Sequence, residues 1–142
     1  MILEGPTSGG FTIREINIFY FSFSRVLVID IEKEKQFKMD SKVFAIPKEI
    51  MEGPGVQLFD HIAKCLADFV EEKGLKESCL PLGFTFSFPC QQEGLAIGKL
   101  TNWTKGFKCS GVEGKDVVLL LREALARRGD VNIEVLSSMR KL

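Results

Sequence analysis

The sequence predicts an α/β domain in which a mixed, twisted sheet of about five strands carries two main helices. Residues 11–31 and 37–46 are rich in β-branched and aromatic side chains, which is typical of strands. Apolar residues recur at helical spacing within 56–73 and 115–128. An apolar run at 80–88 separates these helices, so the expected order is strand, strand, helix, strand, strand, helix, strand.

The N-terminal part predicts a β-hairpin that follows a loose leader. Residues 1–10 combine proline and glycine with little periodicity, so no regular element is expected there. Residues 11–31 are expected to form one strand. Within it, phenylalanines at 19, 21 and 23 alternate with Tyr20, Ser22 and Ser24. A charged turn at 32–36 leads to a second strand at 37–46, and Pro47 ends that strand.

The first main helix is expected after a Gly-Pro-Gly turn at 53–55. Its apolar stripe extends to Gly74, which is a typical C-terminal cap. His61 lies beside the stripe, with no arrangement of carboxylate and nucleophile around it that calls for a base. We therefore interpret His61 as a packing or surface histidine.

The C-terminal part predicts a short strand, a connector, a helix and a last strand. A loop at 90–94 precedes the short strand near 99–103, and a polar connector follows. Asp116 stands where a helix-capping carboxylate is favoured, and Gly129 stands where the second helix stops. A last strand begins at Val131, and we expect the chain to turn within 137–142.

The run at 80–88 predicts a buried central strand with a polar end. Phe84, Phe86 and Phe88 share one face, while small and hydroxylated residues share the other, and Pro89 ends the ladder. The hydroxyl of Ser87 would therefore stand at a strand terminus, with Thr104 and Lys105 on a nearby loop. These donors and acceptors suit a polyol or a phosphorylated ligand better than an apolar one.

The composition argues against several other classes of protein. Lysine plus arginine and aspartate plus glutamate are 19 each, so no net field favours nucleic acid or an acidic membrane. The four cysteines show no C-x-x-C spacing and there is a single histidine, so we expect free thiols and no metal site. No signal peptide or membrane span is indicated, and we expect a cytoplasmic protein.

The letters LGFTFSFP at 82–89 and WTK at 103–105 resemble the signature of eukaryotic hexokinases of the vertebrate hexokinase and glucokinase type. The pattern departs from the family at Ala96, where the family usually has Asp. Resemblance extends over about residues 25–136. It implies the small lobe of a ribonuclease-H-like fold of the actin-like ATPase superfamily, an incomplete lobe at 11–136, and a divergent tail at 137–142.

The resemblance also implies a function and the residues that serve it. Hexokinases transfer the terminal phosphoryl group of ATP to the 6-hydroxyl of glucose or another hexose, the first step of glycolysis. By resemblance, the side chains of Ser87, Thr104 and Lys105 contact sugar hydroxyls, while Phe88 and Pro89 shape the wall of the site. A hydroxyl matches the paired donors and acceptors of a sugar, and a lysine adds a charge-assisted bond.

Two parts of the family machinery are missing from these residues. The family has Asp-Leu-Gly-Gly-Thr-Asn-Phe-Arg as its phosphate loop, whereas this chain has bulky aromatic residues within 18–24 and retains only Arg25. The family's general-base Asp, which follows the last strand, has no counterpart here. We therefore expect no catalytic residue, and we do not expect ATP and magnesium, the family's cofactors, to bind well.

These observations favour a truncated or alternative form of the small lobe that binds hexose weakly and is inactive by itself. The alternative interpretation is a non-catalytic module that binds sugar or regulates by binding a partner. A third interpretation is a fragment without function. Self-association, or a partner on the surface that a second lobe would cover, is expected as well.

Overall fold

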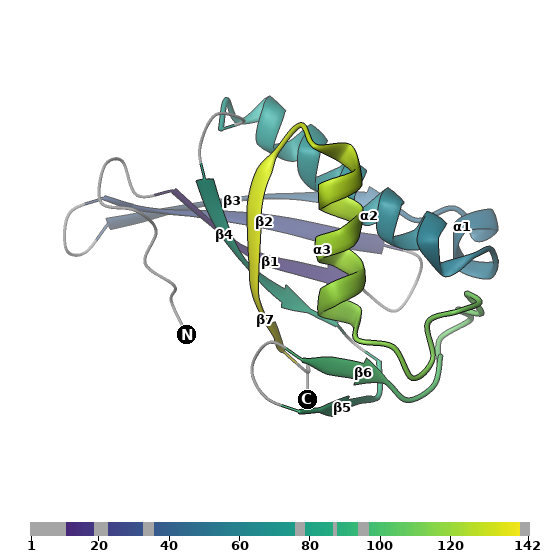
Figure 1. Cartoon of the computed structure of the whole chain (residues 1–142). Coiled ribbons are helices and arrows are strands. Elements are labelled where there is room, and N and C mark those ends of the chain that lie inside the picture. Colours follow the sequence, from purple (N-terminus) through teal and green to yellow (C-terminus); the bar gives the residue numbers. More distant parts are fainter. Residues whose placement is uncertain are drawn as a thin grey trace.

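A computed structural model describes residues 11–18, 23–32, 36–75, 79–86, 88–93 and 97–139 of the chain. Its elements in chain order are β1 (Phe11–Ile18), β2 (Phe23–Glu32), β3 (Gln36–Ala45), α1 (Lys48–Glu52), α2 (Gly55–Glu72), β4 (Cys79–Thr85), β5 (Cys90–Gln92), β6 (Gly98–Leu100), α3 (Val117–Arg128) and β7 (Asn132–Met139). Figure 1 shows α3 lying across the sheet, where it packs against α2. The predicted α/β class with two main helices is confirmed.

The main sheet has five strands in the order β3-β2-β1-β4-β7. The pairs of β1 with β2 and of β2 with β3 are antiparallel, whereas β1 with β4 and β4 with β7 are parallel. The sheet is therefore mixed, as predicted. Strand β4 has a neighbour on each side, and its Leu80, Leu82 and Phe84 side chains are almost fully buried. A separate two-stranded sheet joins β5 to β6.

The prediction of one long strand over 11–31 is wrong. The structure has two antiparallel strands, β1 and β2, whose ends pair at Ile18 and Ser24. Residues 19–22 lie outside the described residues, so the predicted alternation of aromatic side chains there is not tested. No glycine, proline, asparagine or aspartate stands at 19–22, and strand-forming residues continue on both sides. The usual sequence signal for a reversal is therefore missing.

Three further elements differ from the prediction. Helix α1 was not expected, and β5 lies where a loop was predicted. The central strand ends at Thr85 instead of Phe88, although the rings of Phe86 and Phe88 are buried as predicted. The short strand near 99–103 is β6, which already ends at Leu100.

The last strand does not turn at Ser137. β7 runs to Met139, and Ser137, Ser138 and Met139 pair with residues 83, 84 and 85 of β4. The ladder bonds from β4 hold these three residues in a strand, although two serines and a methionine form no typical strand pattern. The five-stranded sheet therefore extends past the expected turn.

Particular residues mark the start of α2 and both ends of α3. A Cβ on Gly55, at the start of α2, would lie 2.2 Å from a methyl group of Val112. At the start of α3, the Asp116 carboxylate accepts the Val118 N–H at 3.0 Å. Gly129 ends α3 with φ +67°, which glycine adopts without strain. Among the described residues, no helix has the length and apolar character needed to cross a membrane.

Candidate functional site

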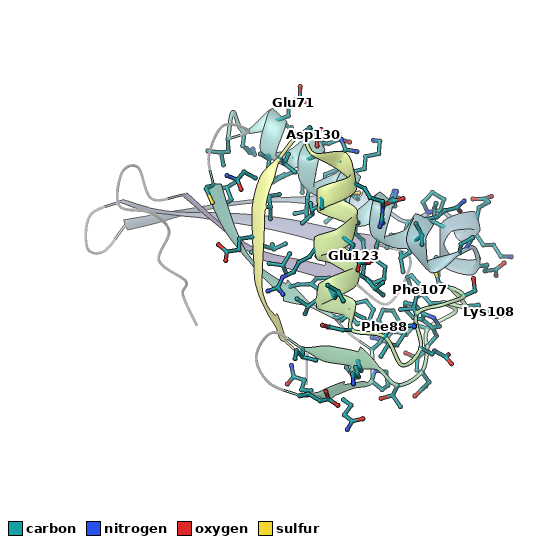
Figure 2. All side chains as sticks on the ribbon, in the orientation of Figure 1. Glu71, Phe88, Phe107, Lys108, Glu123 and Asp130 are labelled. Carbon is teal, nitrogen blue, oxygen red and sulfur yellow. The ribbon has the colours of Figure 1, made fainter. Side chains whose placement is uncertain are left out.

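The structure brings the end of β4 and the loop after β6 into contact. Phe88 follows β4, and its ring centroid lies 4.9 Å from that of Trp103 and 5.0 Å from that of Phe107. The backbone supports the same approach, because the Thr101 N–H donates to the Pro89 carbonyl at 2.8 Å. Figure 2 shows Phe88 and Phe107 close together near the ends of α1 and α3. The two halves of the sequence signature therefore form one cluster.

Four of the five predicted sugar-contact residues lie at this junction, and Ser87 lies outside the described residues. Phe88 is buried, while Pro89, Thr104 and Lys105 are half-buried. The ammonium nitrogen of Lys105 lies 5.5 Å from the centroid of the Phe88 ring. A half-buried hydroxyl and a half-buried ammonium group beside an aromatic ring are suited to bind a ligand with several hydroxyls.

A tight turn presents Thr104 and Lys105. The Phe107 N–H donates to the Thr104 carbonyl at 3.1 Å, and φ is +56° at Lys105 and +84° at Gly106. Positive φ at both central residues is the signature of a type I′ turn. Gly106 adopts it freely, but Lys105 is the one non-glycine residue in the described part of the chain with positive φ. Such strain is often kept where a side chain must be held in place.

Helix α1, which sequence reasoning missed, and the first residue of α2 anchor the far end of this loop. The Lys108 N–H donates to the Met51 carbonyl at 2.8 Å, and the Gly55 N–H donates to the Ser110 carbonyl at 2.9 Å. The Cys109 thiol lies 3.2 Å from the carbonyl oxygens of Ile50 and Met51. The Gly-Pro-Gly turn at 53–55 was the one sequence signal near this anchor.

Neither Cys109 nor His61 has the surroundings of a catalytic group. Burial raises the pKa of the Cys109 thiol to about 11, so the thiol stays neutral near pH 7 and serves as a donor. Nε2 of His61 lies 3.1 Å from the Ala45 carbonyl oxygen and 3.6 Å from the Cys65 sulfur. The interpretation of His61 as a packing residue agrees with this contact between α2 and the end of β3.

A hollow of about 550 Å³ lies beside the loop. Its described lining residues are Trp103, Phe107, Lys108, Cys109, Ser110, Gly111 and Glu113. Thr104 and Lys105 are not among them, although they lie between Trp103 and Phe107 in the chain. The hollow therefore shares two aromatic walls with the predicted sugar turn and was not foreseen from the sequence.

The sequence between β1 and β2 differs from the glycine-containing phosphate loop of the family. No glycine stands between Ile18 and Phe23, and glycine is the residue that lets a backbone approach a phosphate closely. Arg25 lies within β2, where its backbone pairs with Asn17 and Val43. Across the described ranges, no group of three or more His, Cys, Asp or Glu is arranged to hold a metal ion.

The sheet order, the two helices and the anchored turn define the small lobe of a ribonuclease-H-like, actin-like ATPase fold. The family model described as Hexokinase matches residues 20–139, and the chain belongs to the hexokinase family. The predicted family and fold class are thereby confirmed.

Relatives and solved structures agree with this assignment. The chain is 48% identical to hexokinase-2 of Rattus norvegicus over 134 residues and 51% identical to hexokinase HKDC1 of Homo sapiens over 135 residues. In both cases it is covered to 94% but spans only 14% of the relative's length. A hexokinase from Schistosoma mansoni, solved in complex with glucose, superposes with a TM-score of 0.84 at 38% identity, covering 96% of this chain and 30% of that chain.

Proposed function

We propose that this chain supplies the small-lobe half of a hexose site for ATP-dependent phosphorylation of the sugar 6-hydroxyl, the first step of glycolysis. The observation that carries the proposal is the type I′ turn that presents Thr104 and Lys105 beside Phe88. The glucose complex of the Schistosoma mansoni relative supports glucose as the ligand. A cytoplasmic location belongs to the same proposal, because none of the four cysteines, all of which are described, forms a disulfide.

Glucose binding by these residues alone is expected to be weak. Ser87, Thr104 and Lys105 provide a hydroxyl, a second hydroxyl and a cation, which is part of what a sugar with five hydroxyls needs. Each missing charge-assisted hydrogen bond costs roughly 1.5–3 kcal/mol, so two or three of them weaken binding about a thousandfold or more. We therefore expect a Kd no better than about tens of millimolar.

Phosphoryl transfer needs a base for the nucleophile and cations on the moving phosphoryl group. No glycine stands between Ile18 and Phe23 to let the backbone approach ATP phosphates closely. We therefore expect these 142 residues to bind hexose without phosphorylating it. An anchored sugar turn without a phosphate cradle also favours the second candidate, a non-catalytic sugar-binding or regulatory module.

Thermal melts with and without sugar test the proposal. The wild-type chain is compared with a double variant that carries both Ser87→Ala and Lys105→Ala. Each is melted at 50 mM glucose and at an equal concentration of a sugar that hexokinases do not phosphorylate. Binding in the tens of millimolar range adds less than about 1 kcal/mol to the free energy of unfolding. Lys115→Ala removes an equal charge from an exposed position outside the turn and serves as the matched control.

The expected result is a small, glucose-specific rise in Tm that the double variant loses and the Lys115→Ala variant keeps. Equal shifts with both sugars, or a glucose shift that survives in the double variant, would contradict the proposed site. A large glucose-specific shift that the double variant loses would favour the non-catalytic sugar-binding module.

A further inference from the structure

We propose that Trp103 is a positioning residue for the sugar turn: its indole N–H closes the loop that presents Thr104 and Lys105. This inference rests on the proposed function, because it names what holds the proposed sugar contacts in place. Trp103 itself lies half-buried and is not assigned a sugar contact. Its role would be to fix the backbone that follows it directly in the chain.

The central observation is one short hydrogen bond across the loop. Nε1 of Trp103 donates to the Cys109 carbonyl at 2.7 Å. The bond joins two residues that flank the turn, and inside it the Phe107 N–H bonds to the Thr104 carbonyl at 3.1 Å. Cys109 is 3% exposed, so water has little access to replace the indole donor. The loop is therefore closed twice, once by the backbone and once by the indole.

Packing fixes the indole ring from several sides. Its centroid lies 4.9 Å from that of Phe88 at an interplanar angle of 83°, and 5.7 Å from that of Phe107 at 20°. A third ring, Phe86, lies 5.9 Å away at 65°. Edge and stacked contacts of this kind hold a ring in one orientation. The donor is therefore aimed at its acceptor before any ligand arrives.

The acceptor is held as firmly as the donor. The residues on either side of the Cys109 carbonyl are bonded to α1 and to the start of α2. Lys108 bonds to Met51 of α1, and Ser110 bonds to Gly53, which follows α1, and to Gly55, which begins α2. The indole bond thus connects the sugar turn to a helix that is otherwise remote from it in the sequence. Without it, the positive φ of Lys105 would have less to oppose its relaxation.

The test compares Trp103→Phe with Asn102→Ala. Phenylalanine keeps an aromatic ring but lacks the N–H, which leaves a buried acceptor without its donor. Asn102→Ala is the matched control, because it removes an exposed side-chain bond to the neighbouring Trp103 carbonyl. Two readouts are taken by NMR on the full chain: exchange of the Phe107 amide, with the Leu75 amide as an internal reference, and glucose affinity by titration.

We expect Trp103→Phe to speed exchange of the Phe107 amide by about tenfold and to weaken glucose binding by a similar factor, with Leu75 and the control variant unchanged. Because the sequence holds one tryptophan, global replacement by benzothienylalanine is specific to this site. That analogue exchanges the N–H for sulfur at nearly constant shape. It provides a second variant if Trp103→Phe does not fold.

The outcomes separate this inference from the proposed function. An unchanged exchange rate of the Phe107 amide in both Trp103→Phe and the benzothienylalanine protein overturns the positioning role, whatever the glucose affinity. Faster exchange with unchanged glucose affinity also overturns it, because the bond then orders the loop without serving the sugar. No glucose binding by the wild-type chain refutes the proposed function and, with it, the link from the loop to the sugar.

Discussion

The ammonium nitrogen of Lys105 lies 5.5 Å from the ring centroid of Phe88, which is itself 2% exposed. This contact joins the segment that follows β4 to the turn at residues 104–107. Lys105 makes it from a strained backbone, with φ at +56°. At Lys105, attraction to the ring therefore stabilises the fold, whereas backbone strain destabilises it.

Substitutions at Lys105 separate these two effects. Alanine loses the cation–π contact and keeps the strain, whereas glycine loses the contact and relieves the strain, which is worth about 1 kcal/mol. We expect Lys105→Gly to be more stable than Lys105→Ala by about 1 kcal/mol in urea unfolding. Equal stability of the two variants would show that the turn does not strain this residue.

Kinase activity is expected to be undetectable for the chain by itself. A missing general base costs roughly 10²- to 10⁴-fold, and missing phosphate contacts cost more. A coupled assay with ATP, magnesium and glucose measures this directly. Turnover above background that Lys105→Ala abolishes would prove the expectation wrong, since contaminating kinase would not respond to that substitution.

The Cys109 thiol should make stability fall between about pH 9 and pH 11. Burial raises its pKa in the folded chain from 9.0 to about 11. In this window the unfolded chain has lost the thiol proton and the folded chain retains it, so the free energy of unfolding decreases as pH rises. The loss is at most about 2–3 kcal/mol, since one pKa unit corresponds to about 1.4 kcal/mol. Urea unfolding of the wild type and Cys109→Ala across this range should show curves that converge at high pH; parallel curves would contradict the assignment.

The Asp116 carboxylate is expected to stabilise the start of α3. Its Oδ1 accepts the Val118 N–H at 3.0 Å and the Gly98 N–H at 3.2 Å, so it also ties β6 to the helix. Asp116→Ala should cost about 1–2 kcal/mol in urea unfolding. Asp130→Ala, which breaks the pair with Arg128 at the surface, should cost under about 0.5 kcal/mol. Comparable losses in the two variants would count against the capping role.

Self-association is predicted at high concentration. The strand β3 forms one edge of the main sheet and carries Val43, which is 55% exposed. An exposed apolar side chain on an edge strand favours pairing with another chain. Sedimentation should show concentration-dependent association that Val43→Lys reduces, because a charge on an edge opposes such pairing. A clean monomer at high concentration would rule this out.

The sequence alone determined the family, the class of fold and the positions of both main helices. Periodicity is a local property, so the apolar stripes located α2 and α3, and Asp116 and Gly129 marked the ends of α3. Of the predicted site residues, Lys105 lies beside Phe88 in the structure, and Thr104 precedes it in the same turn. The contact role of Ser87, which lies outside the described residues, stays a prediction.

Other features were decided only by the tertiary structure. No glycine, proline, asparagine or aspartate stands between β1 and β2, and Ser137 to Met139 join the sheet because β4 offers them ladder partners. The bond from Trp103 to the Cys109 carbonyl and the link from Lys108 to α1 connect groups whose neighbours in space could not be read from spacing. Backbone hydrogen bonds do not depend on the identity of the side chain, so pairing between distant segments leaves little trace in the sequence.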